Sequence, residues 1–462
     1  MEFTKAYRDE SPDQDLINRH WHDIFPLMKK RYIFANVDNF LFYDVWDNGG
    51  VNENIFAYSN SAGSERAVVF YNNKYDRAQG WIKQSCEYAV KTGEGIEMRS
   101  KTLSEGLGLS AEDDKFMIFR EQRTGLWYIR RSREICERGM FVALNGFEYQ
   151  VLMDIHEVAD MPDGRYRTLC DTLQGRGCYD LEVEWQEICY RDLYQAFSEF
   201  AAAFAPSVHK LFNPADGKIL SEEEIKAGIK TLLADSEKAA VRFYLTANGF
   251  AGSACDMPKE SEQFKQLAKS FELLGGVRAA KMPKKAADSM SALKKAKTVQ
   301  EFLTIAAAND PNLLERLACF AMVKDYAETE LAERWALPRK FAEYFQNAGL
   351  LTGDLRGDLT KLFALAKPAQ SALTEKDKKK AVFALVSPLT QGEKAFMLSG
   401  ANSFNDVTWF NKETTDLSIT YAFAVMALLA DSKHEEEMLK LYADVLAAKN
   451  KAEYKCEDFV KP

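Results

Sequence analysis

The sequence reads NIFAYSN at 54–60, RAVVFYNN at 66–73, LWYIRRS at 126–132 and YQVLMDIHEV at 149–158, and these runs decide the fold. They are short, rich in aromatic and β-branched residues, and separated by turn signals such as Ala62-Gly63-Ser64 and Asn145-Gly146. Several short strands at this spacing are typical of an antiparallel β-sandwich. We therefore predict such a sandwich over residues 37–160.

Helical patterns lie on both sides of the predicted sandwich. Residues 13–30 place apolar side chains at three- and four-residue intervals, which predicts an amphipathic helix. The chain is thus predicted to be an α+β multidomain protein, with an amino-terminal helix in 1–36, the β domain in 37–160 and a strand-free α-helical region in 161–462. Helices are expected at Leu103–Leu109 and Ser132–Gly139 inside the β domain, and at Trp185–Phe204, Ser221–Leu233, Pro311–Tyr326, Ala336–Asn347 and Leu417–Leu429 after it.

The composition excludes several classes of protein. In 462 residues, 60 Lys+Arg stand against 69 Asp+Glu, a formal net charge of -9, so the chain lacks the basic field that non-specific nucleic-acid binding requires. A basic stretch at 281–297 has no aromatic residue to stack on a base, and an exposed helix or linker explains it better. The apolar run Ile419–Ala430 is too short to cross a bilayer, and residues 1–30 show no signal peptide. We predict a cytoplasmic protein that binds neither nucleic acid nor membrane.

The motifs of cofactor and metal sites are missing from the sequence. His20 and His22 are two residues apart on the predicted helix and point in different directions, so a shared metal ion is not expected. The eight cysteines have no metal-binding or disulfide spacing, which predicts reduced, mostly buried thiols. There is no glycine-rich phosphate loop, H-E-x-x-H or G-x-S-x-G string. We predict no cofactor and no metal.

Asp154 and His156 form a candidate polar pair. They alternate with Ile155 and would face the same side of a strand, where they could bind a ligand or transfer a proton. At the exposed edge of a sheet, such a pair is more often a solvated ion pair, and we favour that interpretation.

Three tryptophans of the β domain, Trp46, Trp81 and Trp127, are candidate sugar contacts. Trp46 precedes the turn signal Asn48-Gly49-Gly50, and Trp81 follows Gly80 at the start of a run. A planar ring that faces water can stack on the apolar face of a sugar. The competing interpretation is that these rings fill the core, as most aromatic residues of this domain should, and we favour it for Trp46 and Trp81.

Several long strings of the chain resemble a known family. They are DQDLINRHWHDIFPLMKKRYIFANVDNFLFYDVWDN at 13–48, VNENIFAYSNSAGSERAVVFYNNKYDRAQGWI at 51–82, SEGLGL at 104–109, FMIFREQRTGLWYIRRSREICERGMFVAL at 116–144 and NDVTWFNKETTDLSITYAFAVMAL at 405–428. These strings are similar to the carboxyl-terminal part of large bacterial proteins of the α-amylase superfamily, glycoside hydrolase family 13. In that family the R-H-x-x-x-I-F-P-L-x-x-x-R segment closes the catalytic barrel, and a β domain packs beside it.

The resemblance does not extend to a catalytic site. The family uses a nucleophilic aspartate, a glutamic acid donor and a second aspartate, because one group must stabilise the oxocarbenium-like centre while another protonates the leaving oxygen. The barrel strands that carry these groups would precede residue 13. This sequence has no N-H-D triplet and no G-F-R-x-D string, and the faint echo at Leu355-Arg356-Gly357-Asp358 is better explained as a turn between helices. No catalytic residue is therefore assigned.

The resemblance implies a non-catalytic carboxyl-terminal region of an α-amylase-family glycoside hydrolase or glucanotransferase, inactive by itself. Its partners would be α-glucan and a catalytic barrel that lies upstream or on a separate chain. Two alternatives remain open. Open sugar-stacking rings on the β domain would favour a stand-alone carbohydrate-binding module. A large apolar groove between the later helices, without such rings, would favour a helical protein-interaction scaffold.

Overall fold

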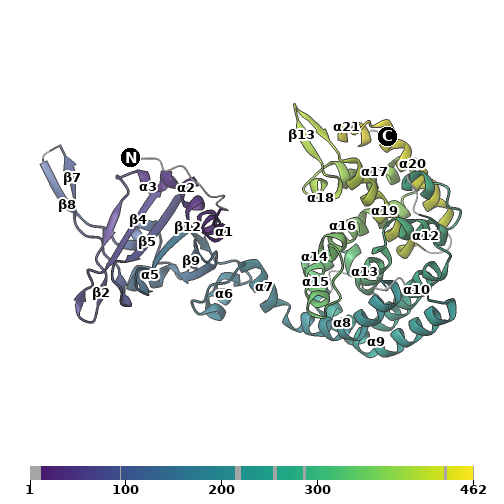
Figure 1. The fold of residues 1–462 in the computed structure, drawn as a ribbon, viewed down its shortest axis with the longest axis horizontal. Coiled ribbons are helices and arrows are strands. Elements are labelled where there is room, and N and C mark those ends of the chain that lie inside the picture. The colour runs from purple at the N-terminus through teal and green to yellow at the C-terminus, as the bar shows by residue number, and fades with distance from the viewer. Residues whose placement is uncertain are drawn as a thin grey trace, which may run out of the picture. The chain divides into compact units, whose positions relative to one another are not determined.

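The computed structural model of the chain describes residues 12–93, 95–213, 220–252, 257–284, 288–430 and 434–460. The chain divides into two compact units, Met1–Cys189 and Tyr190–Pro462 (Figure 1). Antiparallel sheets lie in the first unit and most helices in the second, which confirms the predicted α+β class.

The first unit combines twelve strands with short helices in its described residues. In chain order its elements are α1 (Gln14–Arg19), the π-helical turn η1 (His20–Ile24), α2 (Phe25–Lys29), α3 (Arg31–Ala35), β1 (Leu41–Tyr43), β2 (Trp46–Asp47), β3 (Gly50–Val51), β4 (Ile55–Ala62), β5 (Glu65–Asn72), β6 (Ala78–Ile82), β7 (Tyr88–Thr92), β8 (Gly95–Arg99), α4 (Leu103–Leu107), β9 (Lys115–Glu121), β10 (Trp127–Arg131), α5 (Ser132–Arg138), β11 (Met140–Leu144), β12 (Tyr149–Ala159), α6 (Arg165–Leu173) and α7 (Leu181–Cys189). The helices α4 and α5 interrupt the strands where the sequence predicts helices.

Two sheets organise this unit. A six-stranded sheet has the order β1-β4-β5-β12-β9-β10, and a four-stranded sheet has the order β11-β6-β2-β3. The strands β7 and β8 form a separate hairpin (Figure 1). One buried cluster contains residues of both sheets, among them Val68 and Phe70 of β5 and Val142 and Leu144 of β11. The unit's main core is therefore shared by the two sheets.

Helices cover other residues of the six-stranded sheet. Ile33 of α3 packs in a cluster with Val151 and Met153 of β12. Leu169 of α6 packs in a further cluster with Ile129 of β10, and side chains of α7 lie against it. The expected division at residue 160 follows the end of the last long strand, whereas packing places α6 and α7 with the sheets, up to Cys189.

The amino-terminal helical segment α1–η1–α2 runs to Lys29, near the predicted end. It buries no side chain, and Leu16, Trp21 and Ile24 are exposed. It contacts the sheet through Leu27, which packs against the cluster of Ile33, and through the His22 carbonyl oxygen, which accepts from Gln122 Nε2 at 2.7 Å. Directly after it, Lys30 Nζ donates to Glu65 Oε2 at 2.8 Å and to Asp154 Oδ1 at 2.7 Å. Residues 1–11 of the expected amino-terminal domain lie outside the described part of the chain.

The second unit is a stack of helices with one small hairpin in its described residues. Its elements are α8 (Arg191–Phe212), α9 (Glu222–Ala251), α10 (Glu260–Ala279), α11 (Ser289–Leu293), α12 (Val299–Asn309), α13 (Leu313–Glu328), α14 (Leu331–Arg334), α15 (Leu337–Asn347), α16 (Leu355–Thr374), α17 (Lys378–Thr390), α18 (Ala395–Ser399), β13 (Asn402–Phe404), β14 (Val407–Trp409), α19 (Lys412–Leu429), α20 (Glu435–Lys451) and α21 (Cys456–Val460).

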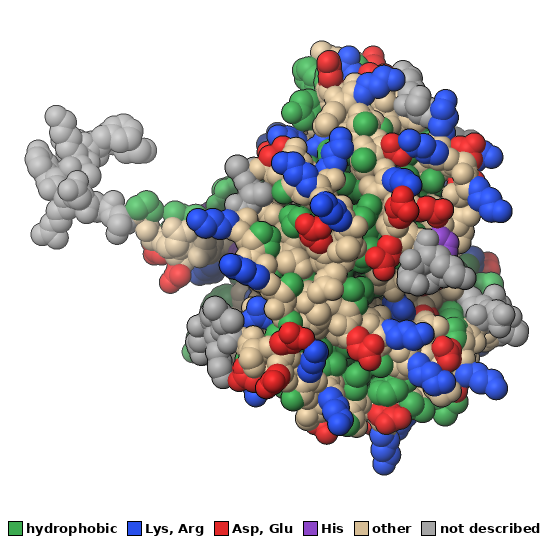
Figure 2. All heavy atoms as spheres, turned by 90° about the vertical axis from the view of Figure 1, so that its right-hand side faces the viewer, with side chains coloured by type: hydrophobic (Ala, Val, Ile, Leu, Met, Phe, Trp, Pro, Cys, Tyr) green, Lys and Arg blue, Asp and Glu red, His purple; other side chains and the backbone are tan. Residues whose placement is uncertain are grey.

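Apolar burial and mixed surface charge characterise this helical unit. Helices α13 and α19 bury most of their side chains in a single large cluster. On the face turned to the viewer in Figure 2, basic and acidic side chains are interspersed, with small apolar areas between them. None of the helices in the described residues has both the length and the apolarity to span a membrane.

Three details of the helical unit differ from the predictions. The predicted helix Trp185–Phe204 is interrupted between α7 and α8. The strands β13 and β14 were not predicted, and their two-residue turn Asn405-Asp406 has positive φ at both positions, as tight hairpin turns require. Leu355-Arg356-Gly357-Asp358 is the first turn of α16 rather than a loop, because Asp354 caps the helix by accepting from Gly357 N at 3.0 Å.

Candidate functional site

A row of exposed apolar side chains crosses the four-stranded sheet. Phe141 pairs with Trp81, Trp81 with Trp46, and Trp46 with Val51, so one residue of each strand contributes to the row. Their exposed fractions are 47%, 40%, 53% and 41%. The rings of Trp81 and Phe141 are 5.4 Å apart between centroids, at an interplanar angle of 54°. We call these four residues the aromatic row.

Strand alternation explains why the row faces away from the core. On β6, Gly80 and Ile82 are buried while Trp81 between them is exposed. Gly80 lets β6 approach β2 closely, since a Cβ there would lie 2.6 Å from Val45 Cγ1 and 2.7 Å from the Trp46 carbonyl oxygen. The short strands thus hold the two tryptophans at paired positions on the exposed face of the sheet.

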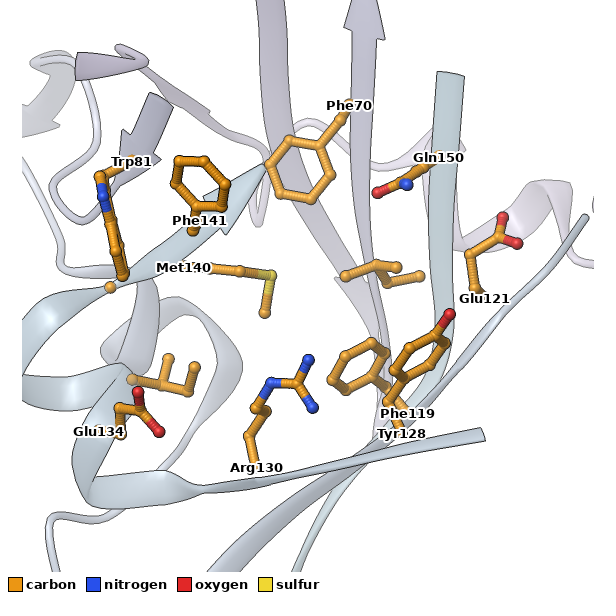
Figure 3. Close-up of a pocket in the computed structure, with 13 residues that line it drawn as sticks. Phe70, Trp81, Phe119, Glu121, Tyr128, Arg130, Glu134, Met140, Phe141 and Gln150 are labelled. Carbon is orange, nitrogen blue, oxygen red and sulfur yellow. The ribbon is translucent and has the colours of Figure 1, made fainter. Parts of the chain in front are cut away.

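A cavity of about 280 Å³ adjoins the aromatic row (Figure 3). Trp81 and Phe141 line it, as do Tyr128 and Arg130 of β10, which share one face of that strand. Its further lining residues are Phe70, Phe119, Glu121, Glu134, Ile135, Gly139, Met140, Gln150 and Leu152. The cavity therefore combines aromatic walls with a few polar side chains, as small-molecule sites do.

Arg130 and Tyr128 form the polar part of one wall. The Tyr128 ring stacks on Phe119 at 5.2 Å between centroids, and the Arg130 guanidinium carbon lies 5.8 Å from the centre of the Tyr128 ring. Arg130 donates to the carbonyl oxygens of Ile129 at 3.0 Å and Gly175 at 2.8 Å. Burial raises the pKa of Tyr128 and lowers the pKa of Arg130.

The carboxylate of Glu121 is engaged by the turn that follows β9. Its Oε1 accepts from Arg123 N at 3.1 Å and its Oε2 from Thr124 N at 2.7 Å. Both oxygens therefore stabilise the turn, and Glu134 on α5 is exposed. The geometry suits binding of a polar ring-shaped molecule better than acid–base chemistry on it.

Trp127 lies apart from the other two predicted sugar contacts. It is the neighbour of Tyr128 on β10 and faces the opposite side, where it packs in the cluster beneath α6 and α7. The Arg120 guanidinium carbon lies 5.7 Å from the centre of its ring. Trp46 and Trp81 are thus brought together, and Trp127 is not.

The side chains of Asp154 and His156 do not form the expected pair in the described structure. A bulge between Met153 and His156, with Asp154 at a positive φ of 54°, breaks the alternation on which that expectation depended. Asp154 instead binds Lys30 at 2.7 Å and Arg120 at 3.2 Å. His156 reaches only the Asp154 backbone, with 2.8 Å between Nδ1 and the carbonyl oxygen.

Sequence reasoning missed Phe141, Val51 and Arg130. The alternation of MFVALN at 140–145 signals that Phe141 is exposed, but its place beside Trp81 depends on strand register. For Arg130 the signal is weaker, since a basic residue on a strand normally reaches solvent. Neither residue could be assigned to a site without the pairing of distant strands.

The cysteines offer no second site among the described residues. All seven that are described are free, three buried and four partly exposed, so fewer are buried than predicted. Cys255 lies outside the described residues. The described residues contain no group of three or more His, Cys, Asp and Glu side chains suited to a metal ion.

Comparisons with protein families, with curated proteins and with solved structures found no match for this chain. The chemistry of the site therefore has to be inferred from its own residues.

Proposed function

We propose that this chain is the non-catalytic carboxyl-terminal region of an α-amylase-family glycoside hydrolase or glucanotransferase, and that its first unit binds α-glucan through the aromatic row. The long strings of sequence that resemble this family support the proposed family membership. The aromatic row is the single observation that supports glucan binding, because rings exposed side by side on a sheet serve no core.

The spacing and number of the rings suit a weak polysaccharide contact. Adjacent strands lie about 4.8 Å apart, so the four positions of the row extend over roughly 14 Å. Each well-formed ring stack is worth roughly 0.5–1.5 kcal/mol beyond the area it buries. Phe141, Trp81 and Trp46 together would then approach the about 4 kcal/mol that millimolar affinity requires.

The exposed apolar side chains of the amino-terminal helix support the barrel as a partner. Leu16, Trp21 and Ile24 contribute to no core cluster of the first unit. A catalytic barrel, upstream or on a separate chain, would cover them. We also propose that the two sheets form the two layers of a β-sandwich. The proposed location of the protein is the cytoplasm.

A groove in the helical unit is the observation that favours the alternative function, a helical protein-interaction scaffold. It measures about 620 Å³, lies between α9 and α10, and is lined in part by Ile229, Leu233 and Ala279. Because the aromatic row is present as well, the condition that would favour a pure scaffold is not met. A stand-alone binding module would use the same row without a barrel.

Calorimetric titration with maltoheptaose tests the proposal. We expect millimolar binding, and a loss of about two- to twelvefold in affinity for Trp46→Ala and for Trp81→Ala, the value of one ring stack. Tyr75→Ala is the matched control, because Tyr75 is an exposed ring of the same unit outside the row. Circular dichroism must show that the variants are folded. Absent heat at saturating glucan, or variants that bind like the wild type, would refute the proposed glucan contact.

A further inference from the structure

We propose that the cavity beside the aromatic row binds a small acidic sugar, a hexose with a carboxylate or phosphate group that pairs with Arg130. This inference does not rest on the α-glucan proposal, because a neutral glucan needs no cation. It concerns the interior of the cavity, whereas Trp46 and Val51 of the row do not line it.

The position of the Arg130 guanidinium carries the inference. Its carbonyl partners, Ile129 and Gly175, use two of its five N–H groups. Figure 3 shows the guanidinium directed into the cavity. Gly175 makes this placement possible, because a Cβ there would lie 3.1 Å from a terminal nitrogen of Arg130. The remaining N–H donors are left for another acceptor.

Arg130 lacks a carboxylate partner in the described residues. None of their Asp or Glu oxygens lies within 4.0 Å of it, although Arg123, Arg131 and Arg133 of the same region all form ion pairs. A partly buried charge without a counter-ion costs free energy, and an anionic ligand would remove that cost. Planar guanidinium groups bind carboxylates and phosphates through two parallel hydrogen bonds.

The acidic side chains of the cavity do not fill this role. Glu121 is held by the backbone amides of Arg123 and Thr124. Glu134 lies in the first turn of α5, where its side chain is exposed. Neither is within ion-pair distance of Arg130, and the charge of Glu134 acts on the guanidinium from a longer distance.

The other walls suit a sugar of one ring. Trp81 and Phe141 offer apolar ring faces, and the Gln150 amide can bond to hydroxyl groups. The volume of about 280 Å³ is close to the lower end of ligand cavities, which measure roughly 300–1,000 Å³. A monosaccharide fits this size better than an oligosaccharide does.

Isothermal titration of the full chain with glucuronate, glucose 6-phosphate and glucose provides the test. We expect at least one acidic sugar to bind tenfold or more tightly than glucose, and to bind more weakly as ionic strength rises. The two acids distinguish a carboxylate ligand from a phosphate ligand. Equal binding of all three sugars, or binding of none, would overturn the inference.

Two variants test whether Arg130 is the positive charge that binds the acidic sugar. Arg130→Gln should weaken binding of the acidic sugar at least tenfold, whereas Arg131→Gln, which removes an arginine from the opposite face of β10, should leave it unchanged. Unchanged binding by Arg130→Gln would also overturn the inference. If Arg130→Gln does not fold, the inference is tested by comparing how tightly the wild-type protein binds the charged and the neutral sugars.

The two proposed sites can fail separately. Trp46→Ala should weaken maltoheptaose binding and leave acidic-sugar binding intact. Arg130→Gln should do the reverse. A result in which both variants weaken both ligands equally would contradict a separate cavity site.

Discussion

At the scale of single residues, Arg316 shows how the helical unit tolerates a buried charge. Its side chain and that of Glu315 are fully buried, and the two are 2.8 Å apart. Arg316 also pairs with Asp358 at 3.2 Å, and Glu315 lies 2.7 Å from Nδ1 of His209. This network joins α8, α13 and α16, because the neighbouring residues Glu315 and Arg316 of α13 pair with each other while His209 contacts Glu315 and Asp358 pairs with Arg316.

Replacing Arg316 by Met should destabilise the helical unit by about 3–5 kcal/mol, because Glu315 would remain buried without its counter-ion. Urea unfolding followed by far-ultraviolet circular dichroism measures the change. Arg356→Met is the matched control, since Arg356 is exposed on α16 and should change stability by no more than about 0.5 kcal/mol. Similar losses in both variants would show that the buried network contributes little.

Glu328 at the end of α13 should make stability depend on pH. Burial, and then the charge of Asp325, raise the pKa of Glu328 from 4.5 to about 7. The folded protein therefore binds this proton more tightly than the unfolded chain does. The stabilising effect is complete below pH 4.5 and is lost as the pH rises through 7.

Urea unfolding of Glu328→Gln should show a smaller loss of stability between pH 5 and pH 8 than the wild type shows. Glu330→Gln, two positions further on and exposed, should keep the wild-type pH dependence. Identical pH profiles for Glu328→Gln and the wild type would mean that this carboxyl titrates normally.

At the scale of elements, Gly80 fixes the distance between β6 and β2. Gly80→Ala should destabilise the first unit by about 1–3 kcal/mol, because its Cβ would press on the Trp46 backbone, and it should also weaken maltoheptaose binding. Gly93→Ala is the control, since a Cβ at Gly93 has nothing within 4 Å. Thermal unfolding and the glucan titration measure both effects. A Gly80→Ala protein as stable as Gly93→Ala would contradict the close approach of the strands.

The amino-terminal helix should be less protected than the central strands of the first unit. Because α1, η1 and α2 bury no side chain, opening them costs little, and amides of residues 13–30 should exchange with solvent faster than those of β5 and β12. Hydrogen exchange with mass spectrometry measures this. Exchange as slow as in the strands, from a monomer, would weaken the proposal that a barrel covers this helix.

At the scale of the whole molecule, the chain should have no glycosidase activity. The resemblance places the catalytic carboxylates on a barrel, and Asp154, the carboxylate of the candidate pair, is bound by Lys30 and Arg120. The purified protein should release no reducing sugar from starch or maltooligosaccharides. Release that follows the protein through purification and disappears in Asp154→Asn would restore Asp154 as a catalytic candidate.

The sequence favoured the core for Trp46 and Trp81, and the structure shows that this was wrong, because both rings are exposed. By itself the sequence determined the α+β class and the positions of α4, α5, α13, α15 and α19. These features follow from local properties, namely the period of apolar residues and the residues that favour turns. The bulge at Asp154 escaped the same reasoning, because alternation is a rule for regular strands and a bulge suspends it.

Only the tertiary structure decided which of these residues form a site. Trp81 lies beside Phe141 and Trp46 because of the register among β11, β6 and β2, although 60 and 35 positions separate them in the chain. The packing of α6 and α7 on the sheet, the loss of Trp127 from the site and the cavity at Arg130 have the same origin. Pairing between distant strands is set by the fit of a whole core, which no short stretch of sequence contains.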